Sequence, residues 1–447
     1  MISLEYMLIL ILKKIKIINP FGFHFLPKNY VFNTVKTFAQ RYKKGIFDKN
    51  YNMRTLANQD FSNRRVIVRV DFNVPIDDQF QVTDSTRITA AKESIDYIIN
   101  QGGSCILISH LGRPKGKDPK LSLSHIVSKV EEILQVPVTF FGDCVGTTAE
   151  QAAASIAPGS VILMENLRFY KEETSGDLVF AEGLSKLGDI YVNDAFGTAH
   201  RAHASTTIIA QFFKKDKFFG RLLEKEVKAI EKVMKSEKKP VLAILGGAKV
   251  SSKITIIENM LDKIDHLIIG GGMVYTFAKA QGGSVGQSIC EDEYCDYALE
   301  LLEKAKSKGV EVHLPIDVII ADDFSNDANR KVCKVGQIPD DWEGLDAGHE
   351  TLKKLYNVVM QSKTILWNGP IGVFEFENFS MGTITLGEYI AQSTAAGAFS
   401  LVGGGDSVAA VKQFGFEDKM SYISTGGGAM LESLEGKILP GIAALLE

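Results

Sequence analysis

From Arg65 onward, short continuous apolar runs rich in β-branched residues alternate with amphipathic stretches. The runs are RVIVRVDF (65–72), SCILISH (104–110), SVILMEN (160–166), DIYVNDA (189–195), VLAILGG (241–247), HLIIGGG (266–272), EVHLPID (311–317), TILWNGP (364–370), FSLVGGG (399–405) and SYISTGGG (421–428). Continuous apolar runs suit strands that are buried on both faces. Strands that alternate with helical stretches, such as 89–100 and 125–134, are typical of parallel sheets. The sequence therefore predicts an α/β fold with two doubly wound, Rossmann-like domains.

The stretch RLLEKEVKAIEKVMKSEKKP (221–240) separates the two sets of runs. It is highly charged, has a helical pattern and ends at Pro240, a residue that stops helices. We expect it to form a helix that connects the two domains.

The composition excludes several classes of protein. The 447 residues are 45% apolar and 23% charged, which is ordinary for a soluble globular chain of two to three domains. The net charge of −4 gives no global basic field for nucleic acid. Five widely spaced cysteines are typical of reduced thiols in the cytoplasm, where we expect the protein to lie.

Residues 1–52 differ from the rest of the chain. They hold nine Lys and Arg against two Asp and Glu, so the remaining residues carry a net charge of −11. Their apolar run Met7–Leu12 is too short to span a bilayer, and the charges around it do not suit a signal peptide. We expect this extension to be disordered or not native. It is either translated from a start codon upstream of a natural start at Met53 or a lineage-specific tail, rather than a targeting or nucleic-acid-binding segment.

In the first half, charged side chains follow the predicted strands. Ligands of open α/β sheets bind beyond the carboxyl ends of the strands, so these side chains should gather at one edge. Arginine forks suit phosphate and carboxylate oxygens. We expect a site for a small, multiply anionic substrate, built from Arg69, Asp71, Asn73, Arg87, His110, Arg113, Arg168, His200, Arg201 and His203.

In the second half, glycines follow the predicted strands, at 246–247, 270–272, 403–405 and 426–428. Glycine lets the backbone approach a ligand and present N–H groups to phosphates. Lys249 and Lys253 are four residues apart, which predicts one shared helix face, and Asp406 could meet a metal ion. No complete P-loop or dinucleotide fingerprint occurs. These features favour a nucleotide with magnesium.

An anion-binding half and a nucleotide half together suggest phosphoryl transfer between two separately bound substrates. This chemistry depends on positioning and on charge neutralisation more than on a covalent intermediate. The sequence carries no GxSxG motif, which agrees with that interpretation.

Taken together, the motifs resemble those of the phosphoglycerate kinase family, over about residues 54–447. The resemblance rests on RVDFNVP (69–75), SHLGRP (109–114), ENLRF (165–169), NDAFGTAHRAHAS (193–205), GGAKVSSK (246–253), WNGPIGVFE (367–375), GGGDS (403–407) and STGGGAMLESLEGK (424–437). It implies reversible, MgATP-dependent transfer between 3-phosphoglycerate and 1,3-bisphosphoglycerate in glycolysis, by a monomeric cytoplasmic enzyme that bends at a hinge. Neither nucleic acid nor a membrane is an implied partner.

The resemblance also implies residue roles. Arg87 and Lys249 would be catalytic, and Arg69, His200 and His203 would support the basic patch. The substrate would be held by Asp71, Asn73, Arg87, His110, Leu111, Gly112, Arg113, Arg168 and Arg201. The nucleotide would be held by Lys253, Glu375, Gly404, Gly405, Asp406 and Ser407, with Asp406 at the metal.

The domains implied in this way are 53–220 with 434–447 for phosphoglycerate, 221–240 as the connecting helix, and 241–433 for the nucleotide. Ser252 replaces the family's usual Asp, and Ala347 and His349 replace Ile and Pro near the nucleoside pocket. Arg221 stands at a usually apolar position near the hinge. Two alternatives remain: an inactive family member that acts as a binding protein, and a nicotinamide-linked oxidoreductase.

Overall fold

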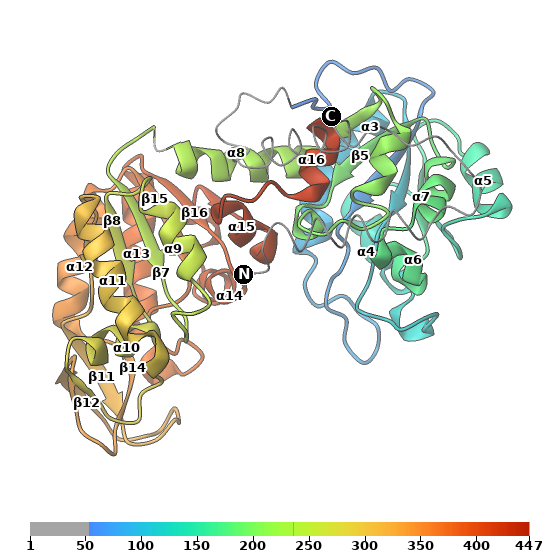
Figure 1. The fold of residues 1–447 in the computed structure, drawn as a ribbon. Helices are drawn as coiled ribbons and strands as arrows, with labels where there is room; N and C mark the ends of the chain where they lie inside the picture. Colours follow the sequence, from blue (N-terminus) through green and yellow to red (C-terminus); the bar gives the residue numbers. More distant parts are fainter. Residues whose placement is uncertain (1–52, 236, 447) are drawn as a thin grey trace, which may run out of the picture. The chain divides into compact units, whose positions relative to one another are not determined.

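Two six-stranded, all-parallel sheets form the framework of the protein (Figure 1). The computed structural model describes residues 53–235 and 237–446. The expectation for residues 1–52 lies outside the described residues. Both predicted parallel sheets are confirmed.

The first sheet has the order β3-β4-β2-β1-β5-β6. Its strands are β1 (Arg65–Val70), β2 (Ser104–Ile108), β3 (Val138–Phe141), β4 (Val161–Met164), β5 (Ile190–Asp194) and β6 (Lys217–Phe219). The chain moves outward from β1 to one side and then returns to the other side of β1 as β5. The strand order therefore reverses between β1 and β5, which is where such sheets bind ligands.

The second sheet has the order β10-β8-β7-β15-β16-β17. Its strands are β7 (Val241–Leu245), β8 (His266–Ile269), β10 (Glu311–His313), β15 (Thr364–Asn368), β16 (Phe399–Val402) and β17 (Tyr422–Ile423). The strand order reverses between β7 and β15. Strands β1, β2, β5, β7 and β15 are buried almost throughout, as their continuous apolar runs predict.

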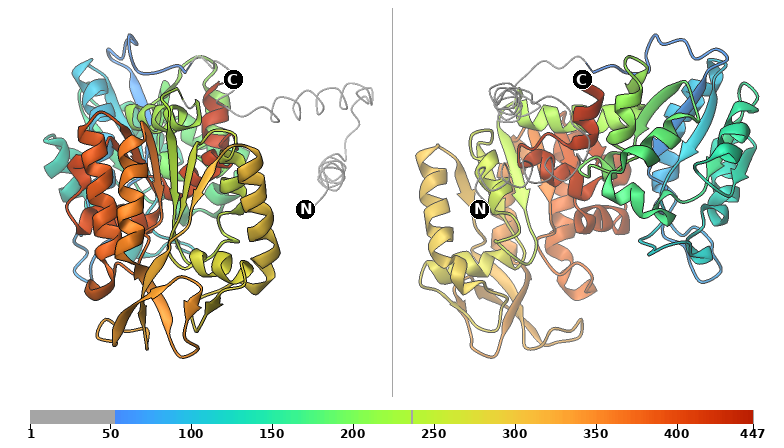
Figure 2. Two further views of the ribbon diagram at one scale, coloured as in Figure 1. Left: turned by 90° about the vertical axis from the view of Figure 1, so that its left-hand side faces the viewer. Right: turned by 45° about the vertical axis from the view of Figure 1, so that its right-hand side comes forward.

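Helices connect most of the successive parallel strands. The helices are α3 (Thr86–Asn100), α4 (Val127–Leu134), α5 (Thr147–Ala154), α6 (Lys171–Ser175), α7 (Leu178–Ser185), α8 (Arg221–Lys235), α9 (Ile254–Met260), α10 (Met273–Ala280), α11 (Cys295–Ser307), α12 (His349–Gln361), α13 (Met381–Ala395), α14 (Gly405–Gln413), α15 (Gly427–Leu434) and α16 (Pro440–Leu446). Helix α8 leads from the first sheet to the second, and α15 and α16 follow the last strand. In the second half, α12 and α13 cover one face of the sheet and α11 covers the other (Figure 2). This layering is that of a doubly wound fold.

The helix predicted for 221–240 is present as α8, which ends earlier, at Lys235. Its start is fixed by two side chains of the first half: the backbone N–H of Arg221 donates to Ser94 Oγ (2.8 Å), and that of Leu223 donates to Asp194 Oδ1 (3.1 Å). One face of α8 buries apolar residues such as Val227 and Ile230, which explains its helical pattern.

The contacts of Arg221 explain why an arginine is tolerated at this usually apolar position. Its guanidinium lies 4.2 Å from the centre of the Tyr97 ring and pairs with Glu93 at 2.8 Å. An arginine can stack on an aromatic face while its charged end stays near solvent.

Five short strands were not predicted. Strands β11 (Asp317–Ala321), β12 (Arg330–Lys334) and β14 (Glu343–Ala347) form an antiparallel sheet, and β9 (Ser284–Val285) pairs with β13 (Gln337–Ile338). Strand β12 is almost entirely exposed, so its sequence carries no apolar run. Strands β3 and β6 of the first sheet were also missed. Strand β3 is only partly buried, and β6 has three residues and begins with a lysine, so neither stands out as an apolar run.

The C-terminal helix α16 lies against the first sheet. Lys217 Nζ of β6 donates to the carbonyl of Ala444 (2.7 Å), and the N–H of Gly441 donates to the carbonyl of Ala199 (2.9 Å). All five cysteines are free; Cys105 and Cys144 are buried and the other three are partly exposed. Among the described residues, helices that are both long and apolar enough to cross a bilayer are absent.

Candidate active site

Arg69 is the anchor of the first-half site. It is the penultimate residue of β1 and is fully buried. Its Nε donates to Ser205 Oγ (2.8 Å), its second terminal nitrogen lies 3.3 Å from His110 Nδ1, and a third contact goes to the carbonyl of Val70. A buried guanidinium needs such partners, because desolvation of an unpaired charge is costly. Arg69 therefore brings together the ends of β1 and β2 and the loop after β5.

Asp71 follows directly after β1 and is nearly buried. Its Oδ2 pairs with Arg87 of α3 at 3.1 Å, and its Oδ1 lies 3.8 Å from His110 Nδ1. Oδ1 has no hydrogen-bond partner. A buried carboxylate oxygen without a donor is suited to accept a hydrogen bond from a ligand hydroxyl.

Asn73 ties three segments together. Its side-chain oxygen accepts from the N–H of Gly112 (2.8 Å), and its carbonyl accepts from Arg87 (3.1 Å). The carbonyl of Gly112 in turn accepts from Arg168 (2.7 Å). Gly112 has a φ of 64°, which favours glycine at this turn. The neighbouring Leu111 is buried, and its carbonyl accepts from Asn166.

The site is strongly electropositive even though its histidines resist protonation. Burial and the nearby Arg168 and Arg69 lower the pKa of His203 to about 4. Burial, with Arg69 next in effect, lowers the pKa of His110 well below its usual value. Burial together with Arg69 and Arg201 also lowers the pKa of Arg168 to about 10. The like charges repel one another, and an anion bound between them relieves that repulsion.

A concave pocket of about 320 Å³ lies beside these residues. Its basic lining consists of Arg113, Lys115, Arg168, Lys171 and Arg201. Arg201 also donates to His200 Nε2 (3.1 Å), and burial lowers the pKa of His200. The structure thus places the predicted anion-binding residues in one region, and adds Lys115 and Lys171 to them.

Glu173 is a residue that the sequence analysis missed. It is fully buried at the end of the first turn of α6 and accepts from the N–H and the hydroxyl of Ser205 (2.9 and 2.6 Å). It also lies 3.8 Å from His203 Nδ1. Through Ser205, which bonds Arg69, Glu173 supports the buried part of the basic site. No local pattern marks it, because its partners are about 30 residues away in the sequence.

The second-half site lies where the strand order reverses between β7 and β15. The N–H of Gly246 donates to the carbonyl of Asn368 (2.9 Å), and a Cβ at Gly246 would lie 2.0 Å from the carbonyl oxygen of Pro370. Only glycine permits this approach of the two strand ends.

Asn368, the last residue of β15, organises this edge. Its side-chain nitrogen donates to the carbonyl of Gly403 (2.6 Å), and its side-chain oxygen accepts from Lys253 Nζ. Burial lowers the pKa of Lys253, opposed by the carboxylate of Asp406. Asn368 was missed as a site residue, although it stands within the WNGP motif.

The prediction that Lys249 and Lys253 share one helix face is wrong. Helix α9 begins at Ile254, so both lysines belong to the turn that precedes it. This turn is held by Ser251, whose N–H and hydroxyl donate to Glu291 (2.9 and 2.6 Å). Ser252 is exposed and its hydroxyl donates to the carbonyl of Lys249 (2.8 Å). Lys249 itself is exposed at the strand-end edge.

The third glycine cluster leads into α14. Gly404 has a φ of 94°, and a Cβ there would lie 2.4 Å from the Asn368 side-chain nitrogen. Gly405 and Asp406 are exposed in the first turn, and Ser407 is buried, accepting from the N–H of Gly369 (2.5 Å). The helix start presents backbone N–H groups, an arrangement that suits phosphate. Glu375 is exposed in the loop after β15.

The two sites together define a class of protein. One is a buried basic site where the strand order of the first sheet reverses, and the other is a site lined by glycines and lysines where that of the second sheet reverses. They fit a phosphotransferase that binds a small anion and a nucleotide on separate sheets. Comparison with known proteins makes this specific: residues 56–437 match the family model described as phosphoglycerate kinase. The chain belongs to the phosphoglycerate kinase family.

Individual relatives agree. A phosphoglycerate kinase of Porphyromonas gingivalis is 52% identical, with 88% of this chain and 99% of the relative covered. A cytosolic phosphoglycerate kinase of Nicotiana tabacum is 50% identical over 88% of this chain and 97% of its own length. The solved structure of phosphoglycerate kinase from Coxiella burnetii superposes with a TM-score of 0.80 at 42% identity, covering 88% of this chain and 99% of that one.

The family's reaction uses ATP and ADP as co-substrates. As a member of this family, the chain is a glycolytic phosphotransferase. The comparisons give no support to the two alternative functions, a nicotinamide-linked oxidoreductase and an inactive binding protein.

Proposed function

We propose that this chain transfers a phosphoryl group directly, in line, between ATP and 3-phosphoglycerate, with the first-half site holding the phosphoglycerate. The observation that carries the proposal is the connected set formed by Arg69, Asp71, Arg87, His110 and Arg168. It places positive charge beside a pocket large enough for a small phosphorylated acid, together with one free carboxylate oxygen.

The roles of the first-half residues follow from their contacts. Arg168, Arg201 and Arg113 bind the substrate phosphate, since all three line the pocket. Asp71 accepts from the substrate hydroxyl, and Asn73, Leu111 and Gly112 shape the wall beside it. Arg69, His200 and His203 maintain the positive potential.

No general base is required. The attacking group is the substrate's own carboxylate, which is ionised near neutral pH. His110 and His203 are also held neutral, with depressed pKa values, and so suit hydrogen bonding better than proton uptake. Arg87 neutralises charge on the transferring group, as an arginine does in other phosphoryl transfers.

In the second half, Lys249 contacts the migrating phosphoryl group and Lys253 the nucleotide phosphates. Gly404, Gly405 and Ser407 shape the phosphate cradle at the start of α14, and Glu375 accepts from the ribose hydroxyls. The exposed carboxylate of Asp406 fits Mg²⁺, which prefers oxygen ligands and usually takes one or two carboxylates along with phosphate oxygens. When bound, the ion neutralises charge on the phosphates.

We further propose the domain division 53–220 with 434–447, 221–240, and 241–433, with α8 as the connecting helix of a hinge. Closure excludes water from the transfer, which would otherwise hydrolyse ATP. The protein acts as a cytoplasmic monomer that binds neither nucleic acid nor membranes. Sedimentation of the purified chain tests the monomer.

The deciding experiment is a coupled assay. The chain is supplied with 3-phosphoglycerate and MgATP, and 1,3-bisphosphoglycerate is consumed by an excess of an NADH-dependent dehydrogenase. NADH oxidation that requires both substrates supports the proposal. Absence of turnover that depends on both ATP and phosphoglycerate would overturn it.

A further inference from the structure

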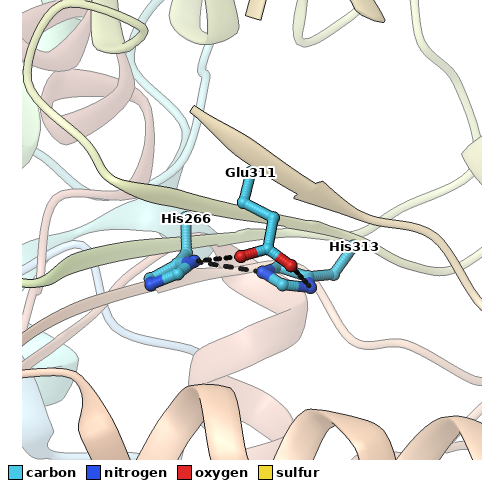
Figure 3. Close-up of side chains that lie close together, drawn as sticks. All are labelled: His266, Glu311 and His313. Atoms are coloured by element: carbon cyan, nitrogen blue, oxygen red, sulfur yellow. Dashed lines mark hydrogen bonds and ion pairs between the residues drawn. The ribbon is translucent and has the colours of Figure 1, made fainter. Parts of the chain in front are cut away.

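Three potential metal ligands, His266, Glu311 and His313, lie together on the second sheet (Figure 3). His266 is the first residue of β8 and pairs in register with Glu311, the first residue of β10. His313 lies two residues beyond Glu311. Alternate residues of a strand face the same side of the sheet, so all three side chains share one face. His266 and Glu311 begin their strands, and His313 is the last residue of β10. Strand β10 lies at one edge of the sheet, far in the strand order from β16, which precedes the phosphate cradle.

The distances between the donor atoms suit a small cation. His266 Nδ1 lies 3.1 Å from His313 Nε2 and 3.6 Å from a Glu311 carboxylate oxygen. One donor atom from each residue falls within 4.8 Å of the others. Two nitrogens bound to tetrahedral zinc at its usual bond length are roughly 3.3 Å apart. The histidine pair is therefore already at ligand spacing.

The burial of His313 and the charge of Glu311 also favour metal binding by this cluster. His313 is 2% exposed. Its Nε2 faces His266, and its Nδ1, which lies 3.7 Å from Glu311 and has no hydrogen-bond partner, can carry the ring proton when Nε2 binds a metal. A metal binds the neutral form of an imidazole, and burial of a ring disfavours its charged form. The Glu311 side chain is 65% exposed and can adjust to complete a site.

We propose that His266, Glu311 and His313 bind one divalent cation of the zinc class. His266 Nδ1, His313 Nε2 and one Glu311 oxygen are the protein ligands, and water completes the coordination. Two imidazoles and one carboxylate suit zinc or cobalt better than Mg²⁺, which prefers oxygen ligands alone. The ion would join β8 to the short edge strand β10 (Glu311–His313) and so stabilise this edge of the sheet.

The test is a Co²⁺ titration of the full-length, chelator-treated protein, with Mg²⁺ present to occupy oxygen-ligand sites. We expect one equivalent of Co²⁺ to give visible absorption bands typical of four-coordinate cobalt, and Zn²⁺ to remove them. Zn²⁺ should also raise the melting temperature, because it binds only the folded chain.

Three variants decide the location. Glu311→Gln and His266→Asn should each weaken Co²⁺ binding by about 10- to 100-fold or more. His125→Asn, a histidine of the first half, is the control and should bind as the wild type does. Glu311→Gln keeps the test valid if substitution of a histidine impairs folding, since its side chain is largely exposed.

Two results would overturn the proposal. If the wild type shows neither visible bands nor a Zn²⁺-dependent shift, the cluster is a hydrogen-bonded histidine pair beside a carboxylate. If Glu311→Gln and His266→Asn bind Co²⁺ as tightly as the control, the ion is held by other residues.

Discussion

Glu226 of α8 accepts hydrogen bonds from both the backbone N–H and the hydroxyl of Thr425, at 2.7 and 2.8 Å. Glu226 is fully buried, and Thr425 stands in the loop that follows β17. Burial raises the pKa of Glu226 to about 7, although both bonds from Thr425 oppose that shift. The connecting helix is thus joined to the end of the second sheet by a carboxyl group that titrates near neutral pH.

This contact makes stability depend on pH. In the folded protein Glu226 keeps its proton up to about pH 7, whereas the unfolded chain loses it near the ordinary glutamate pKa of 4.5. The folded state binds more protons in that window, so the contribution of Glu226 to stability falls as pH rises from about 4.5 to 7.

Glu226→Gln should remove this dependence. The amide oxygen can still accept from Thr425, and the cost of burying a charge disappears. We expect the stability of the variant relative to wild type to rise between pH 5 and 7, by about 1–3 kcal/mol, and to level off above that. Urea unfolding at several pH values measures the difference, and a constant difference would show that Glu226 ionises normally. Comparison with wild type cancels the effects of Asp194 and Asp346, whose pKa values burial also raises to about 7.

Lys249→Ala should reduce kcat by about 10²- to 10³-fold, the range typical when one charge-stabilising donor is removed. KM for ATP should change much less, because Lys249 is proposed to act on the migrating group. Lys308→Ala is the control, since Lys308 is a lysine of the same half that pairs with Asp262. A wild-type kcat in Lys249→Ala would exclude Lys249 from the transfer.

Arg87→Ala should also lower kcat by about 10²-fold, and it removes the partner of the nearly buried Asp71 carboxylate. Arg87→Lys retains the positive charge but lacks the planar guanidinium that can make two parallel hydrogen bonds. It should therefore recover only part of the kcat that Arg87→Ala loses. Arg65→Ala is the matched control, because Arg65 pairs with Asp189 at the opposite end of β1. Steady-state kinetics of the three variants settle the role, and equal kcat values for Arg87→Ala and Arg65→Ala would contradict it.

Gly246→Ala should destabilise the protein by about 1–3 kcal/mol or more, because the added Cβ would overlap the carbonyl oxygen of Pro370. Gly142→Ala is the control, since a Cβ there meets no atom within 4 Å. Urea unfolding compares the two. Equal midpoints would mean that the ends of β7 and β15 can separate without cost.

Much of the framework could be predicted, because buried parallel strands leave a local mark. The runs at β1, β2, β7 and β15 are mostly apolar and are buried almost throughout, and the polar residues that follow them, such as Asp71, lie where the chemistry is expected. The antiparallel strand β12 could not be recognised, since it is almost entirely exposed and three of its five residues are charged.

Errors at the site arise from contacts between distant parts of the chain. The spacing of Lys249 and Lys253 suggested a helix, but Ser251 is held in a turn by Glu291, 40 residues away. Glu173 and Asn368 act by supporting other residues, and that role exists only once the sheets are formed. Local patterns therefore locate the residues that carry charge better than those that position them.

The reversal of strand order in each sheet has a consequence for how the protein is made. Strand β1 ends at Val70 but its neighbour β5 begins at Ile190, and β7 ends at Leu245 while β15 begins at Thr364. Neither site can assemble on the ribosome until more than a hundred further residues have been synthesised. Such non-local pairing slows folding. The apolar residues of β1 and β7 are therefore exposed to aggregation in the growing chain until β5 and β15 have been synthesised and can pair with them.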